Sequence, residues 1–124
     1  MLPTFMPPET VTRQNGASAE VALENSCRLA QFTLGITRIL EHESLEVSIW
    51  GSADRQDWRL IAAFPQKSYC GTYLLLLDLA HHADLRFLRA QWKMGRWGNQ
   101  ERAPLFGFYL RVEEGRLAHR ASAA

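Results

Sequence analysis

The chain has 124 residues, of which 47% are hydrophobic and 22% are charged, and its formal net charge is +1. This length fits one globular domain and leaves no room for a second. The near-neutral charge excludes a strongly basic nucleic-acid binder and an acidic disordered tail as the main character of the protein. For the same reason we do not expect nucleic acid as the main partner. No apolar stretch approaches the roughly 18 residues of a membrane-spanning helix, so we expect no membrane insertion.

The first 20 residues are predicted to form an extended arm. They hold three of the five prolines and the loop-like segment Gln14–Ser18. They show neither a basic leader region nor a long apolar run, so we expect a cytoplasmic protein, or part of a particle assembled in the cytoplasm. The apolar side chains of the arm must dock on their own domain or on a neighbouring protein, and they are Leu2, Phe5, Met6 and Val11.

From residue 21 onward the chain is predicted to be β, because no segment shows a capped helical stripe. Short apolar or alternating runs separated by turn residues are typical of a β-sandwich or barrel. We therefore expect an all-β, jelly-roll-like antiparallel sandwich over 21–114, with a flexible tail at 115–124. The predicted strands are 27–40 (one long strand, or two around Gly35), 45–49, 58–64, 69–79, 86–94 and 106–112, with a connection or helical turn at 80–84.

Strand 69–79 contains four consecutive leucines, so both of its faces are apolar. Leu74 and Leu76 share one face, and Tyr73, Leu75 and Leu77 share the other. Because a sandwich strand has one core-facing side, the second face must lie under the arm, under a loop or in an interface. The predicted assembly contacts are Leu2, Phe5, Met6, Tyr73, Leu75 and Leu77.

Residues 84–102 form the densest basic and aromatic stretch, with five basic and two acidic residues. Trp92 falls on the apolar face of its strand and is predicted to be a core residue. Trp97 is predicted at the tip of the polar loop 95–104, where it suits a protein contact, packing within the chain, or stacking on a sugar or base. The candidate binding surface is Arg89, Lys93, Arg96, Trp97 and Asn99.

No motif in the sequence indicates catalysis or a bound metal. The adjacent His81 and His82 are the one cluster of metal-type ligands, but neighbouring strand residues point to opposite faces. Cys27 and Cys70 fit no metal spacing, and we expect two free thiols unless an oxidising compartment pairs them. We therefore predict a protein that is not an enzyme and needs no cofactor.

Two segments together resemble a known family. The first, Ser52-Ala53-Asp54-Arg55-Gln56-Asp57-Trp58, resembles the element Ser-x-Asp-Gly-x-x-Trp of the discoidin-like, galactose-binding-like β-sandwiches. The second, Arg86-Phe87-Leu88-Arg89, resembles the Arg-Tyr-Val-Arg strand of the same fold. Small phage-type structural proteins carry a similar pair of elements. Arg55 replaces the turn glycine of the family, so the turn need not be of the same type.

The resemblance covers about residues 44–112 and implies a sandwich that binds glycan, lipid or protein through loops at one end. No loop residue can be carried over, because no loop motif matches. Independently of the resemblance, Ser52 and Asp54 are predicted to bind the N–H groups of the turn, and Trp58 to plug the end of the core.

Together these features predict an interaction or assembly protein that forms a homo-oligomer or joins a larger protein assembly, such as a phage-like particle. The alternative is a carbohydrate-binding module that uses the loop around Trp97, with a glycan as its partner.

Overall fold

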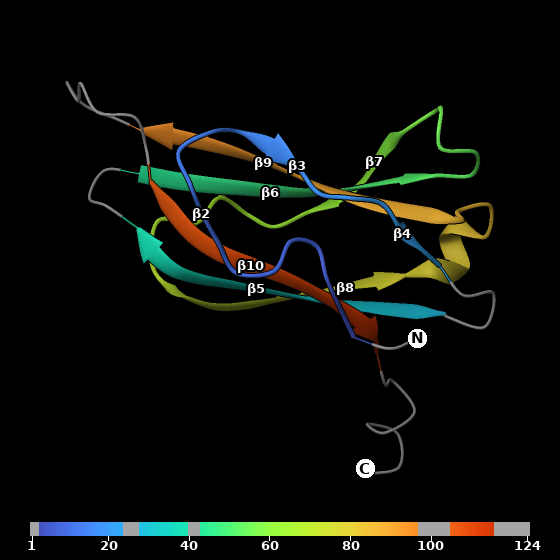
Figure 1. The fold of residues 1–124 in the computed structure, drawn as a ribbon. Coiled ribbons are helices and arrows are strands. Elements are labelled where there is room, and N and C mark those ends of the chain that lie inside the picture. The colour runs from blue at the N-terminus through green and yellow to red at the C-terminus, as the bar shows by residue number, and fades with distance from the viewer. Residues whose placement is uncertain (1–2, 24–27, 40–42, 97–104, 116–124) are drawn as a thin grey trace, which may run out of the picture.

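The computed structural model describes residues 3–23, 28–39, 43–96 and 105–115. These residues form two antiparallel sheets that pack face to face as a sandwich (Figure 1). The all-β prediction is confirmed, and the predicted connection at 80–84 is largely the short 3₁₀ turn η1 (Leu79–His82).

The first sheet, which we call the β5 sheet, has the order β1-β10-β5-β8, and β2 also pairs with β10. Its strands are β1 (Thr4–Phe5), β2 (Thr10–Thr12), β5 (Leu29–Ile39), β8 (Gly71–Asp78) and β10 (Phe106–Glu114).

The second sheet, which we call the β6 sheet, has the order β3-β9-β6-β7, and β4 also pairs with β9. Its strands are β3 (Gly16–Ala17), β4 (Val21–Ala22), β6 (Glu43–Ser52), β7 (Arg59–Ala63) and β9 (Phe87–Arg96). Gly95 and Arg96 therefore belong to a strand, and not to the loop in which the sequence placed them, because they pair with Ser44 and Glu43 of β6.

The order of pairing is that of a jelly roll. We count β1 with β2 as the first strand of the roll and β3 with β4 as the second. The first strand then pairs with the last, β10, and the second pairs with β9. β5 pairs with β8, and β6 pairs with β7. A ribbon of strand pairs with this order wraps around one core and closes through the β10·β5 and β9·β6 pairs. The jelly-roll prediction is confirmed.

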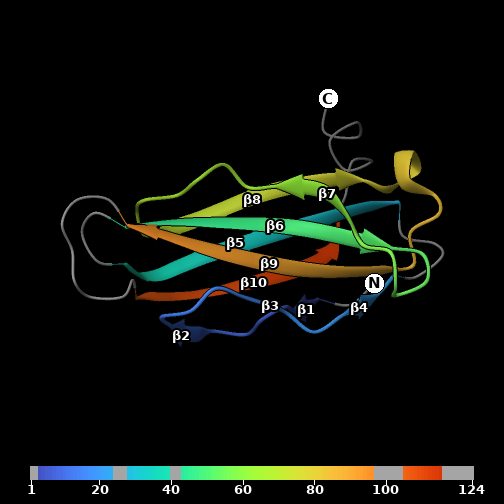
Figure 2. The same cartoon turned by 90° about the horizontal axis from the view of Figure 1, so that it is seen from above.

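The predicted arm supplies the first two strands of the roll. It runs along β10 of one sheet and then along β9 of the other, on the side of the sandwich opposite β7 and β8 (Figure 2). Met6 is 2% exposed, and its N–H donates to the carbonyl of Leu110 over 2.7 Å. The apolar residues of the arm were expected to dock on their own domain or on a neighbouring protein. Met6 docks on its own domain.

The core lies between the sheets and takes alternate residues from the long strands β5, β6, β9 and β10, as the period of two requires. In β9 the buried positions are Leu88, Ala90 and Met94, which is the face the sequence predicted. Trp92 packs against the same core, with its ring edge-on to Phe108 at 5.3 Å between centroids. The predicted core role of Trp92 is confirmed.

Candidate functional site

Strand β8 is the free edge of the β5 sheet, because β5 is its one neighbour among the described residues. The N–H of Leu79 donates to the carbonyl of Arg28, 2.8 Å away, and continues the β5·β8 register beyond Asp78. Hydrogen bonding alternates along an antiparallel strand, so every second residue of β8 binds β5 through its backbone. The residues whose N–H and C=O groups point to the open edge are Thr72, Leu74 and Leu76, together with the N–H of Asp78, whose carbonyl begins the turn η1.

These edge residues also turn their side chains to the outer face of the sheet. Leu74 is 63% exposed and Leu76 is 39% exposed. Leu77, by contrast, is buried in the core, and Tyr73 and Leu75 pack against it.

The face of β8 selected from the sequence for assembly therefore points inward, and the open face is that of Leu74 and Leu76. The sequence could not distinguish the two, since both faces of this strand are apolar.

The remaining predicted assembly contacts lie elsewhere. Phe5 lies on the outer face of the β5 sheet, half exposed, with its ring edge-on to Tyr109 at 5.9 Å. Met6 is a core residue and is covered by its own domain. Leu2 lies outside the described residues.

The outer face of the β6 sheet carries an open groove of about 400 Å³. The cross-strand register places Trp50 of β6 opposite Leu60 of β7 and Arg89 of β9. The indole N–H of Trp50 donates to the hydroxyl of Ser48 over 2.9 Å, which fixes the ring against the sheet. Residues that line the groove include Glu46, Ser48, Trp50, Leu60, Gln91 and Lys93.

Two residues of the predicted binding surface lie on this outer face. Lys93 lines the groove opposite Glu46, and the guanidinium of Arg89 stacks 4.3 Å above the ring of Trp58. Arg96 ends β9, while Trp97 and Asn99 lie outside the described residues.

Trp50 and Leu60 were not predicted from the sequence to be surface residues. The alternation of β6 held the signal for Trp50, because that residue is in phase with the polar Glu46 and Ser48.

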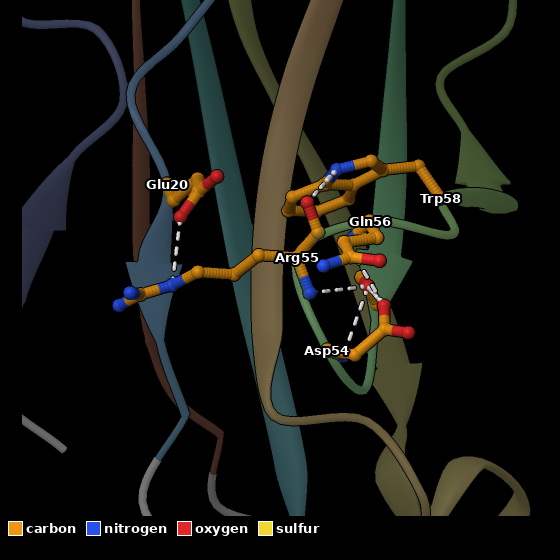
Figure 3. A network of polar contacts seen from close by, with 6 residues as sticks. Glu20, Asp54, Arg55, Gln56 and Trp58 are labelled. Carbon is orange, nitrogen blue, oxygen red and sulfur yellow. Dashed lines mark hydrogen bonds and ion pairs between the residues drawn. The ribbon is translucent and has the colours of Figure 1, made fainter.

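The turn between β6 and β7 is held by two side-chain oxygens (Figure 3). The hydroxyl of Ser52 accepts the N–H groups of Asp54 and Arg55, at 3.1 and 2.9 Å. The Oδ1 atom of Asp54 accepts those of Gln56 and Asp57, at 2.8 and 2.9 Å. The bonds to Oδ1 stabilise the charged carboxylate and hold the pKa of Asp54 below its usual value. The N–H of Asp57 lowers this pKa most, and the N–H of Gln56 lowers it next. The predicted roles of Ser52 and Asp54 are confirmed.

Arg55 occupies the turn position at which the resembling family has glycine, and it adopts φ 68°, the left-handed region that glycine favours. Its Nε lies 3.0 Å from a carboxylate oxygen of Glu20 (Figure 3). Its guanidinium lies 4.2 Å above the ring of Phe87. The backbone therefore keeps a glycine-like conformation here, and the side chain ties the turn to the N-terminal segment.

Trp58 lies outside the core, so the prediction that it plugs the end of the sandwich is wrong. Its ring N–H donates to the carbonyl of Arg55 over 3.2 Å, and its face receives the guanidinium of Arg89. A tryptophan that has its polar edge on a turn and its face under a cation covers the surface next to the turn.

A bidentate ion pair joins β7 to the segment after η1. Two nitrogens of Arg59 lie 2.7 and 2.8 Å from the carboxylate oxygens of Asp84. This pairing lowers the pKa of Asp84 and raises that of Arg59. The charges of this region thus join two elements of the fold.

No protein-family model matches the chain, and no curated protein matches it in sequence. The chain is similar in fold to a chain in the solved structure of infectious bursal disease virus, Gx strain. The match covers 94% of this chain with a TM-score of 0.55 and 9% sequence identity. A chain of the Gt strain of the same virus matches over 92%, with a TM-score of 0.49 and 11% identity. This chain spans about a third of those two chains, 32% and 30% of their lengths.

A likeness to the Gx chain at 9% identity shows a shared fold and nothing finer. It is a β-sandwich that also occurs in a chain of a virus structure. Among the residues that the structure describes, no group of three or more metal-type side chains lies together, and no helix is long and apolar enough to cross a membrane. Cys70 is exposed and free, and Cys27 lies outside the described residues.

Proposed function

We propose that this chain is a non-enzymatic structural component that assembles with other protein through the free edge of its β5 sheet. The observation that carries the proposal is the pair of exposed leucines, Leu74 and Leu76, beside β8 backbone groups that have no partner within the described part of the chain. Soluble proteins shorten their edge strands or interrupt them with charges, prolines and bulges. β8 has eight residues, no proline, and no charge before Asp78.

The fold supports the same proposal. The Gx chain, which shares the sandwich, belongs to a virus structure, so an assembled particle is a fitting setting for this domain. The sequence resemblance to small phage-type structural proteins points in the same direction. In such a setting another protein covers the apolar edge, which removes the risk of uncontrolled association.

Light scattering coupled to size-exclusion chromatography tests the proposal. We expect the wild-type mass to exceed that of the monomer and to rise with concentration, because burying the leucines drives association. The double variant Leu74→Glu/Leu76→Glu should be monomeric. Leu60→Glu, an exposed leucine of the other sheet, is the matched control and should behave as wild type. A wild-type monomer at every concentration would contradict self-assembly.

Carbohydrate binding is a second candidate function, and the groove on the β6 sheet favours it. The groove offers the indole of Trp50 together with the hydroxyl, amide and charged groups of Ser48, Gln91, Glu46 and Lys93. An aromatic surface with a few polar groups around it is typical of small-ligand sites. Calorimetric titration with sugars at millimolar concentration tests this function. Trp50→Ala should abolish any binding, and the absence of heat for the wild type would exclude this function.

A further inference from the structure

The open edge of β8 sets the chemistry of its partner. Four residues direct their backbone N–H groups, and all but Asp78 also their C=O groups, away from β5, and their side chains to the outer face. Such an edge is satisfied by another extended strand that runs beside it, with apolar side chains at the alternate outer positions. The four residues are Thr72, Leu74, Leu76 and Asp78.

Building on the proposed assembly function, we infer that this partner is strand β8 of a second copy of the chain, antiparallel to the first and related by a two-fold axis through Leu75. A two-fold axis perpendicular to the sheet keeps both outer faces on the same side. Opposite residues of an antiparallel pair share a face. The axis must therefore lie midway between one residue and the same residue of the second copy, and not between two successive residues.

The backbone selects Leu75 as the centre. Leu74 then stands opposite Leu76 of the second copy, and Thr72 opposite Asp78 of the second copy, so all four edge residues form hydrogen-bonded pairs. Each such pair exchanges two bonds, except that the carbonyl of Asp78, the N-cap of η1, already accepts the first bond of that turn, which leaves a ladder of about six hydrogen bonds. A centre at Leu76 would place Thr72 opposite Ala80, which already belongs to the 3₁₀ turn, and a centre at Leu74 would place Asp78 opposite Cys70, outside the strand.

The side chains are self-complementary in this register. Leu74 and Leu76 of both copies form one cluster of four leucines on the outer face, which buries the two most exposed apolar side chains of β8. The hydroxyl of Thr72 faces the carboxylate of Asp78 across the joint, and no like charges oppose each other. The result is one sheet that continues through two sandwiches.

The free edge of the other sheet is β7, and its features explain why we place the interface on β8 and not on β7. β7 has five residues, begins with the exposed Arg59, and has a register irregularity opposite Ile49 and Trp50. A short strand, a charge and a bulge are the features that keep edges from pairing. The β5·β8 pairing runs without such an irregularity from Leu29 to Ile36.

Site-directed disulfide formation tests the register. The two native cysteines are replaced by serine, and circular dichroism confirms that the variants fold. Leu74→Cys and Leu76→Cys are then oxidised separately and as a mixture allowed to exchange subunits. Opposite residues of a hydrogen-bonded pair lie about 5.5 Å apart between Cα atoms, within disulfide reach, and diagonal neighbours lie about 7–8 Å apart. We expect rapid cross-linking in the mixture and little in either variant alone.

The outcomes separate this inference from the proposed function. Cross-linking of Leu74→Cys alone, at the rate of the mixture, would move the axis to Leu74 and overturn the register. No cross-link in any sample, while light scattering shows an association that Leu74→Glu/Leu76→Glu abolishes, would overturn the two-fold register and leave assembly through the β8 edge standing. A chain that is monomeric throughout overturns this inference and excludes self-assembly as the form of the proposed function.

Discussion

At the scale of single residues, the turn between β6 and β7 shows how an arginine adopts a backbone conformation that glycine favours. Arg55 adopts φ 68°, a conformation that costs an ordinary L-residue about 1–2 kcal/mol. Its side chain meets the carboxylate of Glu20 and the ring of Phe87. Each of these exposed contacts contributes up to about 1 kcal/mol, which is enough to offset the strain.

This balance predicts different effects of two substitutions at the same position. Arg55→Ala removes both contacts and keeps the strain, so it should destabilise the domain by about 1–2 kcal/mol. Arg55→Gly removes the contacts and relieves the strain as well, so it should lie about 1 kcal/mol closer to wild type. Urea unfolding measures both variants. Equal stability of the two would show that the backbone of residue 55 is not strained.

The carboxylate of Asp54 predicts a pH dependence. Its folded pKa lies below the ordinary value of 3.8 because the N–H groups of Asp57 and Gln56 and the hydroxyl of Ser52 stabilise the charged form. A lowered folded pKa contributes stability that is fully present above the ordinary pKa and is lost as the pH falls through the folded pKa.

Asp54→Asn should therefore lower the melting temperature at pH 7, and the difference from wild type should vanish in strong acid. Thermal melts followed by circular dichroism from pH 7 to about pH 2 measure this effect. Asp57→Asn, in the same turn, is the control for removal of a charge. A difference that persists unchanged into acid would exclude ionisation of Asp54 as its cause.

At the scale of elements, the packing of β5 against β10 depends on a missing side chain. Gly35 stands opposite Tyr109, and a Cβ atom on residue 35 would lie 2.2 Å from the tyrosine ring. The ring thus lies directly over the glycine and extends to Phe5 of β1. These contacts link three neighbouring strands on the outer face of the β5 sheet.

Gly35→Ala should destabilise the domain by about 1–3 kcal/mol, because the ring of Tyr109 must move aside. Tyr109→Ser empties that space, so the double variant should lose less stability than the sum of the two single variants. A double-mutant cycle in urea measures this coupling. Additive losses would mean that the ring already moves freely away from Gly35.

The strands of the domain could be predicted from the sequence, but the face that points inward could be predicted for only some of them. Alternation in β9 identified the inward face, because polar residues occupy the opposite positions. Alternation gave no answer in β8, where Leu74 and Leu75 are equally apolar, and the inward face is set by its pairing with β5.

The candidate sites were partly predictable for the same reason. The apolar excess of β8 pointed to a shared surface, and the basic residues Arg89 and Lys93 pointed to the outer face of the β6 sheet. The groove also needs Trp50 and Leu60, which lie ten positions apart and meet only through the β6·β7 register. No local pattern reports such a cross-strand pair.

At the scale of the whole molecule, the chain closes on itself, because its first strand pairs with its last. Thr4 stands opposite Val112, and Phe5 opposite Arg111. The strands of residues 4–22 have two or three residues each, too few to show a period, so the sequence indicated a loop-like arm. Their place in the roll is set by backbone pairing with β10 and β9, and by the burial of Met6.

Deletion of residues 1–12 should therefore damage the fold. It removes both short strands on β10 and the buried side chain of Met6, whose truncation alone costs about 2–5 kcal/mol. We expect a large fall in melting temperature, or loss of the cooperative transition, together with association through the newly exposed edge of β10.

Two point variants separate packing from strand pairing in that deletion. Met6→Ala should reproduce part of the loss, and Phe5→Ala, at an exposed neighbouring position, should cost much less. Calorimetric melts of the three proteins measure the order, in which the deletion is least stable and Phe5→Ala is nearest to wild type. If the deleted protein melted like the intact chain, residues 1–12 would be a detachable arm, and strands β3 to β10 would form a stable sandwich without them.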